Sequence, residues 1–180
     1  MLMPRNTGPF TKVASTIVAV VLAIAVAWLK SQPGHSANRR AGQPSGFPAL
    51  SGSYDLGRDE NLGGHTLHRH VGRTDQQLRE RLEEERDIAA ASTYNDRAAA
   101  ERTVAAALAQ NRGRVERWLQ RSDAHPNLTV QFRGNAPIGR SIRRGGQNSE
   151  TCFEALVILH WDEDNRFHVL TSYPEAYHGR

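Results

Sequence analysis

The chain contains very little cysteine, and this scarcity limits its chemistry. Cys152 is the only cysteine among 180 residues. A disulfide within the chain is therefore impossible, and so is a zinc or iron–sulfur site built from several cysteines. The sequence also lacks a Walker loop, a GxSxG elbow and a GxGxxG fingerprint. These absences argue against P-loop nucleotide hydrolases, serine hydrolases and dinucleotide-binding enzymes.

Lysine is almost as scarce, so the positive charge of the chain is carried by arginine. Lys12 and Lys30 are the only lysines among 23 Lys and Arg residues, and the formal net charge is +4. The planar guanidinium group of arginine matches the geometry of phosphate oxygens, which favours an anionic partner. Charge alone does not distinguish RNA, DNA or a membrane surface.

One uncharged apolar run, residues 13–29, stands near the N-terminus. Its length is close to the lower limit for crossing a bilayer as a helix. The basic residues before it and the small residues Ala25 and Ala27 suit a cleavable signal peptide. Trp28 and Leu29 extend the apolar stretch, which suits an uncleaved single-pass anchor instead. Both readings predict a membrane-anchored or secreted protein, and a buried soluble helix is the remaining alternative.

The composition of the chain divides it into three parts. Residues 1–30 form the membrane-targeting segment. Residues 31–54 are rich in Pro, Gly and Ser and predict a flexible linker. The remaining residues, 55–180, carry the hydrophobic periodicity of a folded domain.

Helical signals dominate the first half of this domain. Thr74 and Gln77 have the spacing of a capping box, which predicts a helix after residue 74. Asn95 or Asp96 follows as the cap of a long helix that runs to about residue 120. The pair Arg112-Gly113 predicts a break or bend in that helix.

The second half has the period of strands. Apolar residues alternate over residues 128–132, and residues 152–161 and 167–173 are also strand-like. The turn residues 162–165 between the last two predict a β-hairpin. Helices followed by antiparallel strands indicate an α+β fold.

Three histidines lie within six residues in the segment GGHTLHRHVG, residues 63–72. Imidazole exchanges protons near neutral pH, so His65 is a candidate general acid or base. The paired glycines before it allow a sharp turn of the backbone that places His65 at the start of a helix. His65 and His68 could instead bind a metal, but no third ligand and no HExxH pattern accompany them. The alternative is that these histidines cap or line a helix.

Arginines recur where a phosphate could bind. Arg79 and Arg81 lie on the helix after the histidines, and four more stand in the Gly-rich middle of the domain, at positions 133, 140, 143 and 144. A solvated surface is the ordinary explanation for any one of them. The acidic run Glu83-Glu84-Glu85 has the pattern of an exposed helix end rather than of paired catalytic carboxylates.

The last strand places two hydroxyl groups on one face. Thr171 and Tyr173 are two residues apart, so their side chains point to the same side of an extended chain. A hydroxyl and a phenol there could bind a phosphate or a base edge, and the ring could stack. An ordinary sheet surface would look the same.

Six motifs in this order resemble the bacterial ribonuclease-A-like domain of contact-dependent growth-inhibition (CdiA C-terminal) toxins. They are ExxGGH at 60–65, HTLxxHVG at 65–72, LxxRL at 78–82, ASTYND at 91–96, GRxIRRG at 139–145 and VLTSYP at 169–174. The resemblance implies an α+β ribonuclease fold without disulfides. It also implies metal-independent endoribonuclease activity without a cofactor, in which the ribose 2′-hydroxyl attacks the adjacent phosphate.

The resemblance also implies roles for individual residues. His65 matches the histidine of the family's GGH motif and is expected to transfer protons. Arg81 matches the helix arginine that stabilises the phosphate, with Arg79 as the second choice. Thr171 and Tyr173 match the hydroxyl and phenol that position the substrate, and Tyr173 is a candidate acid.

Two further histidines, His70 and His168, lie outside these role assignments. His70 is a second catalytic candidate, although its position one helical turn beyond His65 also suits a structural role. His168 lies three residues before Thr171, and strand alternation predicts that it faces the opposite side of the strand.

The expected partners are an RNA substrate, an immunity protein and a membrane contacted through residues 13–29. The alternative function is a catalytically inactive, membrane-tethered domain that binds RNA or another protein.

Overall fold

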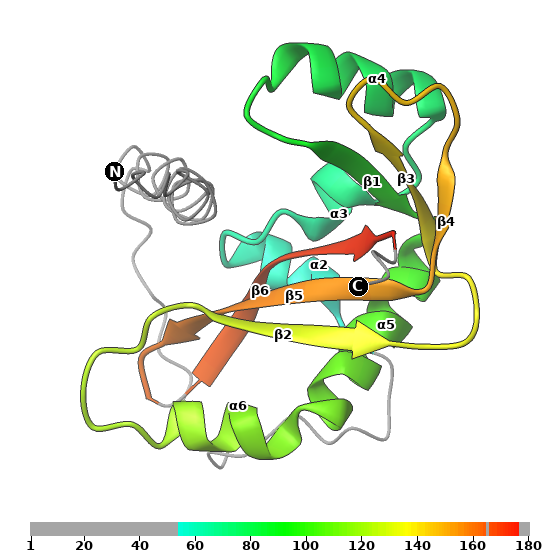
Figure 1. Cartoon of the computed structure of the whole chain (residues 1–180). Helices are drawn as coiled ribbons and strands as arrows, with labels where there is room; N and C mark the ends of the chain where they lie inside the picture. The colour runs from blue at the N-terminus through cyan, green and yellow to red at the C-terminus, as the bar shows by residue number, and fades with distance from the viewer. Residues whose placement is uncertain (1–53, 165, 177–180) are drawn as a thin grey trace, which may run out of the picture. The chain divides into compact units, whose positions relative to one another are not determined.

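The computed structural model describes residues 54–164 and 166–176, which form an α+β domain (Figure 1). The predicted membrane-targeting segment and nearly all of the predicted linker lie outside the described residues. None of the described helices has the length and hydropathy that a membrane span requires. In chain order the elements are α2 Leu56–Asn61, α3 Thr66–His70, α4 Asp75–Glu84, β1 Ala90–Tyr94, α5 Arg97–Gln110, α6 Arg112–Leu119, β2 Leu128–Arg133, β3 Gly139–Arg143, β4 Glu150–Cys152, β5 Glu154–Asp162 and β6 Arg166–Glu175.

The helix boundaries follow the capping signals of the sequence. Thr74 and Gln77 make a reciprocal capping box before α4. The side chain of Asp96, and not that of Asn95, accepts a hydrogen bond from the backbone of Ala99 and caps α5. The break predicted at Arg112-Gly113 is present one residue earlier, at Asn111, which ends α5 and precedes α6. These predictions are confirmed.

The strands form two antiparallel three-stranded sheets, ordered β2-β5-β6 and β1-β3-β4. The predicted hairpin is present as β5 and β6. Strand β1, which lies between α4 and α5, was not predicted. The strand predicted over residues 152–161 is confirmed from Glu154 onward as β5, but its start is wrong. The chain leaves one sheet and enters the other at Phe153. Cys152 pairs with Gly139 in the smaller sheet, whereas Glu154 pairs with Arg133 in the larger one.

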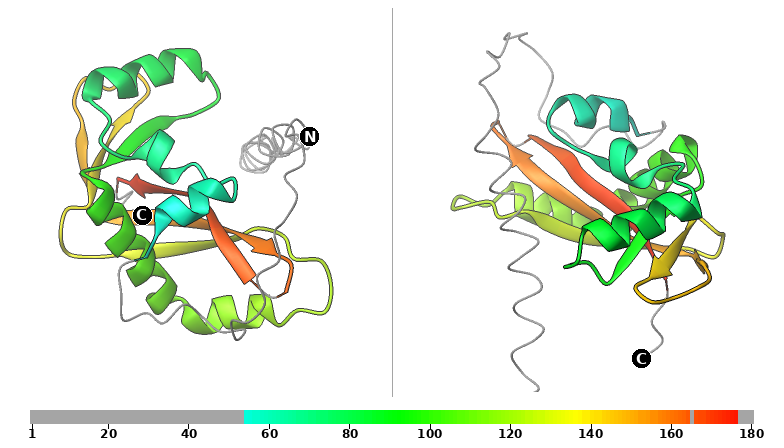
Figure 2. Two further views of the ribbon diagram at one scale, coloured as in Figure 1. Left: turned by 180° about the vertical axis from the view of Figure 1, so that it is seen from behind. Right: turned by 90° about the horizontal axis from the view of Figure 1, so that it is seen from above.

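Each sheet buries one face against helices. Helices α5 and α6 supply Val104, Leu108 and Trp118 to the larger core, where strand residues such as Val157 and Val169 are fully buried. Helix α4 places Leu78 and Leu82 against the smaller sheet in a second core. Figure 2 shows these helices from behind and from above. Burying such side chains is the main favourable contribution to folding.

The two sheets meet where β6 ends beside β1 and β3. There the Tyr94 hydroxyl and Ser172 Oγ share a buried hydrogen bond of 2.6 Å. Helix α2 is fixed to the other half of β6 through Asp59, and α3 through the backbone of His65, which bonds to Leu170. The buried Oδ2 of Asp59 accepts hydrogen bonds from the Val169 backbone N–H at 2.8 Å and from the Tyr54 hydroxyl at 2.7 Å. Strand β6 therefore contacts α2, α3 and both sheets.

A β-bulge interrupts β6 beside α3. Ile158 pairs with Thr171, but the next residue, Leu159, pairs with Val169, so Leu170 has no partner across the ladder. An extra residue shifts the alternation of side chains by one position. As a result His168, opposite His160, lies on the same face of the sheet as Thr171. The prediction that His168 faces the other side is wrong for this reason.

Candidate functional site

His65 begins helix α3, where two glycines bring its backbone against strand β6. Gly63 has a positive φ of 106°, a conformation that suits glycine. A Cβ on Gly64 would lie 2.5 Å from the Val169 carbonyl oxygen, so the strand allows no side chain there. The His65 backbone N–H donates to the Leu170 carbonyl at 3.0 Å. The predicted delivery of His65 to a helix start is confirmed.

The surroundings of His65 favour its neutral form. Burial lowers the pKa of the imidazole to about 4, with further contributions from the positive charges of Arg69 and Arg81 and from His68. Glu85 acts in the opposite direction. A neutral imidazole at physiological pH is ready to accept a proton.

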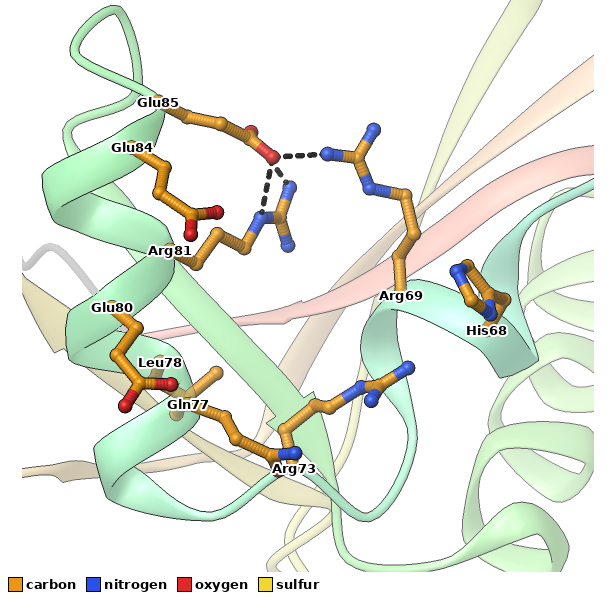
Figure 3. A pocket seen from close by; sticks show the side chains of 9 residues that line it. All are labelled: His68, Arg69, Arg73, Gln77, Leu78, Glu80, Arg81, Glu84 and Glu85. Carbon is orange, nitrogen blue, oxygen red and sulfur yellow. Dashed lines mark hydrogen bonds and ion pairs between the residues drawn. The ribbon is translucent and has the colours of Figure 1, made fainter.

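Arg81 reaches this region from helix α4. Its Nε donates at 3.3 Å to Oε1 of Glu85, four residues later, which caps the C-terminal end of α4. Arg69, from α3, donates to the same carboxylate oxygen. Figure 3 shows the two guanidinium groups and Glu85 between α3 and α4. They line a groove of about 310 Å³.

His70 is buried and connects Arg81 to Tyr173. Its Nδ1 lies 3.4 Å from both Arg81 Nη1 and the Ser92 carbonyl oxygen. Its ring is 5.4 Å from that of Tyr173, centroid to centroid. Burial, and then the charge of Arg81, hold the pKa of His70 well below its usual value. The neutral imidazole can accept from Arg81 or donate to Ser92 through Nδ1, but not both at once.

Thr171 and Tyr173 share one face of β6, as predicted. They pair with Ile158 and Leu156, alternate residues of β5. The Thr171 hydroxyl is buried and has no hydrogen-bond partner in the described residues, although an unpaired buried hydroxyl is costly. Burial raises the pKa of the Tyr173 phenol, Glu175 adds to this effect and Arg81 opposes it. Tyr173 therefore remains a proton donor at neutral pH.

The other predicted arginines have structural partners. Arg79 donates to the Gln147 carbonyl at 2.8 Å, so the second choice for the phosphate contact is engaged elsewhere. Arg140 binds Asp75, and Arg144 binds carbonyl oxygens of the segment that ends α4. Arg133 and Arg143 pair with Glu154 and Glu150.

Two members of the site, Arg69 and Glu85, were not predicted from the sequence. Arg69 lies between two histidines in the HRH triplet, and only the histidines were considered as candidates. Its spacing of four residues from His65, which places both on one helix face, is the signal that could have identified it. Glu85 was assigned to an exposed acidic run. Glu83 and Glu84 are indeed exposed, but Glu85 is partly buried against Arg81, four residues earlier. Among residues 54–164 and 166–176, no three His, Cys, Asp or Glu side chains could hold a metal ion together.

The chain belongs to the family of bacterial CdiA-CT RNase A domains. The family model matches residues 64–174, a segment that contains every candidate from His65 to Tyr173. A solved structure, the crystal structure of a CdiA-CT/CdiI complex from Y. kristensenii, contains a similar chain. The two chains are 30% identical with a TM-score of 0.57, and the match covers 63% of this chain and 100% of that one. No curated protein gives a match. The resemblance inferred from the six motifs is confirmed.

Proposed function

We propose that this chain is a toxin-type endoribonuclease that cleaves RNA without a metal ion, by attack of a ribose 2′-hydroxyl on the adjacent phosphate. The observation that carries the proposal is the position of His65 at the start of α3, four residues before Arg69. There burial first, and then the charges of Arg69 and Arg81, lower the pKa of its imidazole. A base beside a phosphate-binding cation is what this reaction needs. Membership of the CdiA-CT RNase A family supports the same activity.

His65 acts as the general base. It takes the proton of the 2′-hydroxyl while the 2′-oxygen forms a bond to phosphorus. The phosphorus then carries additional negative charge on its equatorial oxygens. The guanidinium group of Arg81 is permanently charged and stabilises that charge, because arginine cannot deprotonate in a protein.

Tyr173 acts as the general acid. The bond from phosphorus to the 5′-oxygen breaks, and the phenol gives its proton to that oxygen. The products are a 2′,3′-cyclic phosphate and a free 5′-hydroxyl. His65 then loses its extra proton to solvent, and the Tyr173 phenolate takes one up. The unpaired hydroxyl of Thr171 binds a phosphate oxygen or base edge. His70 positions Arg81 and Tyr173, which it contacts from a buried site.

The products distinguish this mechanism from metal-assisted hydrolysis. We expect the full-length protein to cleave an RNA oligonucleotide in EDTA and leave a 2′,3′-cyclic phosphate. It should not cleave DNA of the same sequence, which lacks the attacking hydroxyl. Cleavage that depends on added divalent metal, or products with a 5′-phosphate, would contradict the proposed mechanism.

The cellular context is part of the proposal. Residues 13–29 deliver the protein to a membrane, either as an anchor or as a signal peptide, and residues 55–180 form the catalytic domain. The solved relative is a complex of CdiA-CT with CdiI, which supports an immunity protein as the partner of this chain. Expression of the domain in the cytoplasm should stop growth, and co-expression of the cognate immunity protein should restore it.

The pH dependence of cleavage follows from the low pKa of His65. Below a pH of about 4 the imidazole binds a proton and can no longer act as a base. The parameter kcat/KM reports the ionisation of the free enzyme. We therefore expect kcat/KM to fall about tenfold per pH unit below pH 4 and to be flat between pH 5 and 7. A decline beginning near pH 6.5 would contradict the assignment, and circular dichroism at each pH would detect acid unfolding.

Replacing Tyr173 by phenylalanine removes the proposed acid but keeps the ring beside His70. We expect kcat to fall by about 10²-fold or more with little change in KM. Tyr94→Phe is the matched control, because it also deletes one buried phenol but breaks only the hydrogen bond to Ser172. That variant should lose about 1 kcal/mol of stability and keep its kcat. If Tyr173→Phe and Tyr94→Phe have the same kcat, Tyr173 is not the general acid.

A further inference from the structure

An ion cluster joins helices α3 and α4 beside His65. Arg69 comes from α3, four residues after His65. Arg81 lies in the last turn of α4, and Glu85 is the residue that caps its C-terminal end. The two arginines contact one carboxylate oxygen, Glu85 Oε1, and Arg81 Nη2 also donates to Oε2 at 3.3 Å. No motif of the sequence assigned a function to Arg69 or to Glu85.

We propose that Arg69 is a second phosphate-binding cation of the site, and that Glu85 is an internal anion that aligns Arg69 and Arg81 and is displaced from them by the substrate phosphate. This inference rests on the proposed function and deepens it. Arg69 and Arg81 thus form a clamp from two helices, and Glu85 occupies the clamp in the free protein.

The shared oxygen shows that the clamp fits an anion. A carboxylate and a phosphodiester each carry one negative charge over two terminal oxygens, and guanidinium groups bind both with the same donor geometry. Because Glu85 Oε1 accepts from Arg69 and Arg81 together, an oxygen placed there contacts cations from both helices. Arg81 alone would hold a phosphate from one side only.

The clamp is open to solvent on the side of the groove. The exposed fraction of the side chain is 39% for Arg69, 20% for Arg81 and 33% for Glu85. A phosphate can therefore reach the arginines without unfolding either helix. The other charged groups that line the groove are Arg73 from the loop after α3 and Glu80 and Glu84 from α4 (Figure 3).

The charge of the cluster suits the reaction. Two guanidinium groups and one carboxylate leave one net positive charge, which balances a phosphodiester in the ground state. The pentacoordinate transition state carries more negative charge than the substrate. Release of Glu85 exposes both positive charges to it, and interactions that strengthen in the transition state accelerate the reaction. The opposite effects of Glu85 and the two arginines on the pKa of His65 also place the cluster within electrostatic reach of the base.

The test separates binding from cleavage. The full-length protein is titrated with a fluorescent 2′-O-methyl RNA oligonucleotide, which cannot be cleaved because its 2′-oxygens are methylated. Cleavage of the unmodified oligonucleotide is measured in parallel. Arg69→Ala should weaken binding by about tenfold or more, since a charge-assisted hydrogen bond to phosphate is lost. Arg69→Lys should recover part of that affinity, and kcat should fall further in Arg69→Ala than in Arg69→Lys.

Glu85→Gln tests the internal anion. It keeps the size of the side chain and one acceptor oxygen but removes the competing charge. We expect it to bind the 2′-O-methyl RNA roughly three- to tenfold more tightly, with a lower kcat because Arg69 and Arg81 lose their alignment. Arg114→Ala, which removes one positive charge from the exposed face of α6, is the control for general electrostatic attraction.

Two results would overturn the inference. One is an Arg69→Ala protein that matches Arg114→Ala in both affinity and kcat. The other is a Glu85→Gln protein that binds RNA as weakly as Arg69→Ala, which would make Glu85 a structural support only. If the wild-type protein binds RNA without cleaving it, the proposed function fails, and the clamp is still judged by the affinities alone.

Discussion

Replacement of His65 by alanine should lower the rate of RNA cleavage by about 10²–10⁴-fold while leaving RNA affinity nearly unchanged. The reason is that His65 is proposed to move a proton and not to hold the substrate. Burial and the neighbouring arginines lower the pKa of its imidazole, whereas the charges proposed to bind RNA belong to Arg69 and Arg81. The measurement is kcat with an RNA oligonucleotide, together with the Kd for its 2′-O-methyl form.

His160→Ala is the matched control for this experiment. His160 is also partly buried, but its Nδ1 contacts Asn127 Oδ1 at 2.9 Å and no proposed catalytic residue. The control should retain kcat within a few-fold of the wild type. An equal loss in both variants would show that the cleavage defect comes from general damage to the fold.

The second large effect concerns the glycine that precedes His65. In Gly64→Ala the new Cβ would lie 2.5 Å from the Val169 carbonyl oxygen and 2.9 Å from that of Asp59. Both are backbone atoms, so α2 or β6 must move. We expect a loss of about 3 kcal/mol in the free energy of unfolding, and a loss of cleavage because His65 moves away from β6. Urea unfolding of the full-length protein measures the first effect.

Gly113→Ala is the control for the loss of a glycine. A Cβ on Gly113 would meet only Arg117 Nη1, at an ordinary contact distance of 3.5 Å. Since alanine is the better helix former, this variant should be as stable as the wild type or up to about 1 kcal/mol more stable. Similar destabilisation in both variants would contradict the close packing of Gly64 on β6.

Local rules predicted much of the fold because the relevant residues are close in sequence. Thr74 and Gln77 make their capping box within one turn. The turn that joins β5 to β6 is short and contains Asp164 at a φ of 63°, which Asp tolerates better than most residues. Such signals need no knowledge of the distant parts of the chain.

The features of the fold that could not be predicted from local sequence depend on hydrogen bonding between strands that are distant in the chain. Strand β1 has the sequence AASTY, in which alanine gives little strand preference, and it is fixed by pairing with β3 some fifty residues later. The apolar run around Phe153 has no proline or glycine to divide it, yet its two parts join different sheets. The bulge at Leu170, which turns His168 to the face of Thr171, is likewise a property of the pairing with β5.

In the candidate site too, some residues could be predicted from local motifs, and others depend on contacts between distant parts of the chain. The family motifs indicated His65, Arg81, Thr171 and Tyr173 as catalytic, and the structure brings Arg81 and Tyr173 together through His70. Arg69 and Glu85 became apparent only when α3 and α4 were placed side by side. Their contact joins residues 16 positions apart through a short helix and a loop, and neither alone differs from a surface charge.

The most direct test of the account is cleavage of total RNA by the purified full-length protein in EDTA, beside the His65→Ala protein. We predict that the wild-type protein cleaves the RNA and that the variant does not. Absence of cleavage by a folded wild-type protein would contradict the account and favour a domain that binds RNA or another protein. Equal cleavage by both proteins would contradict the role of His65.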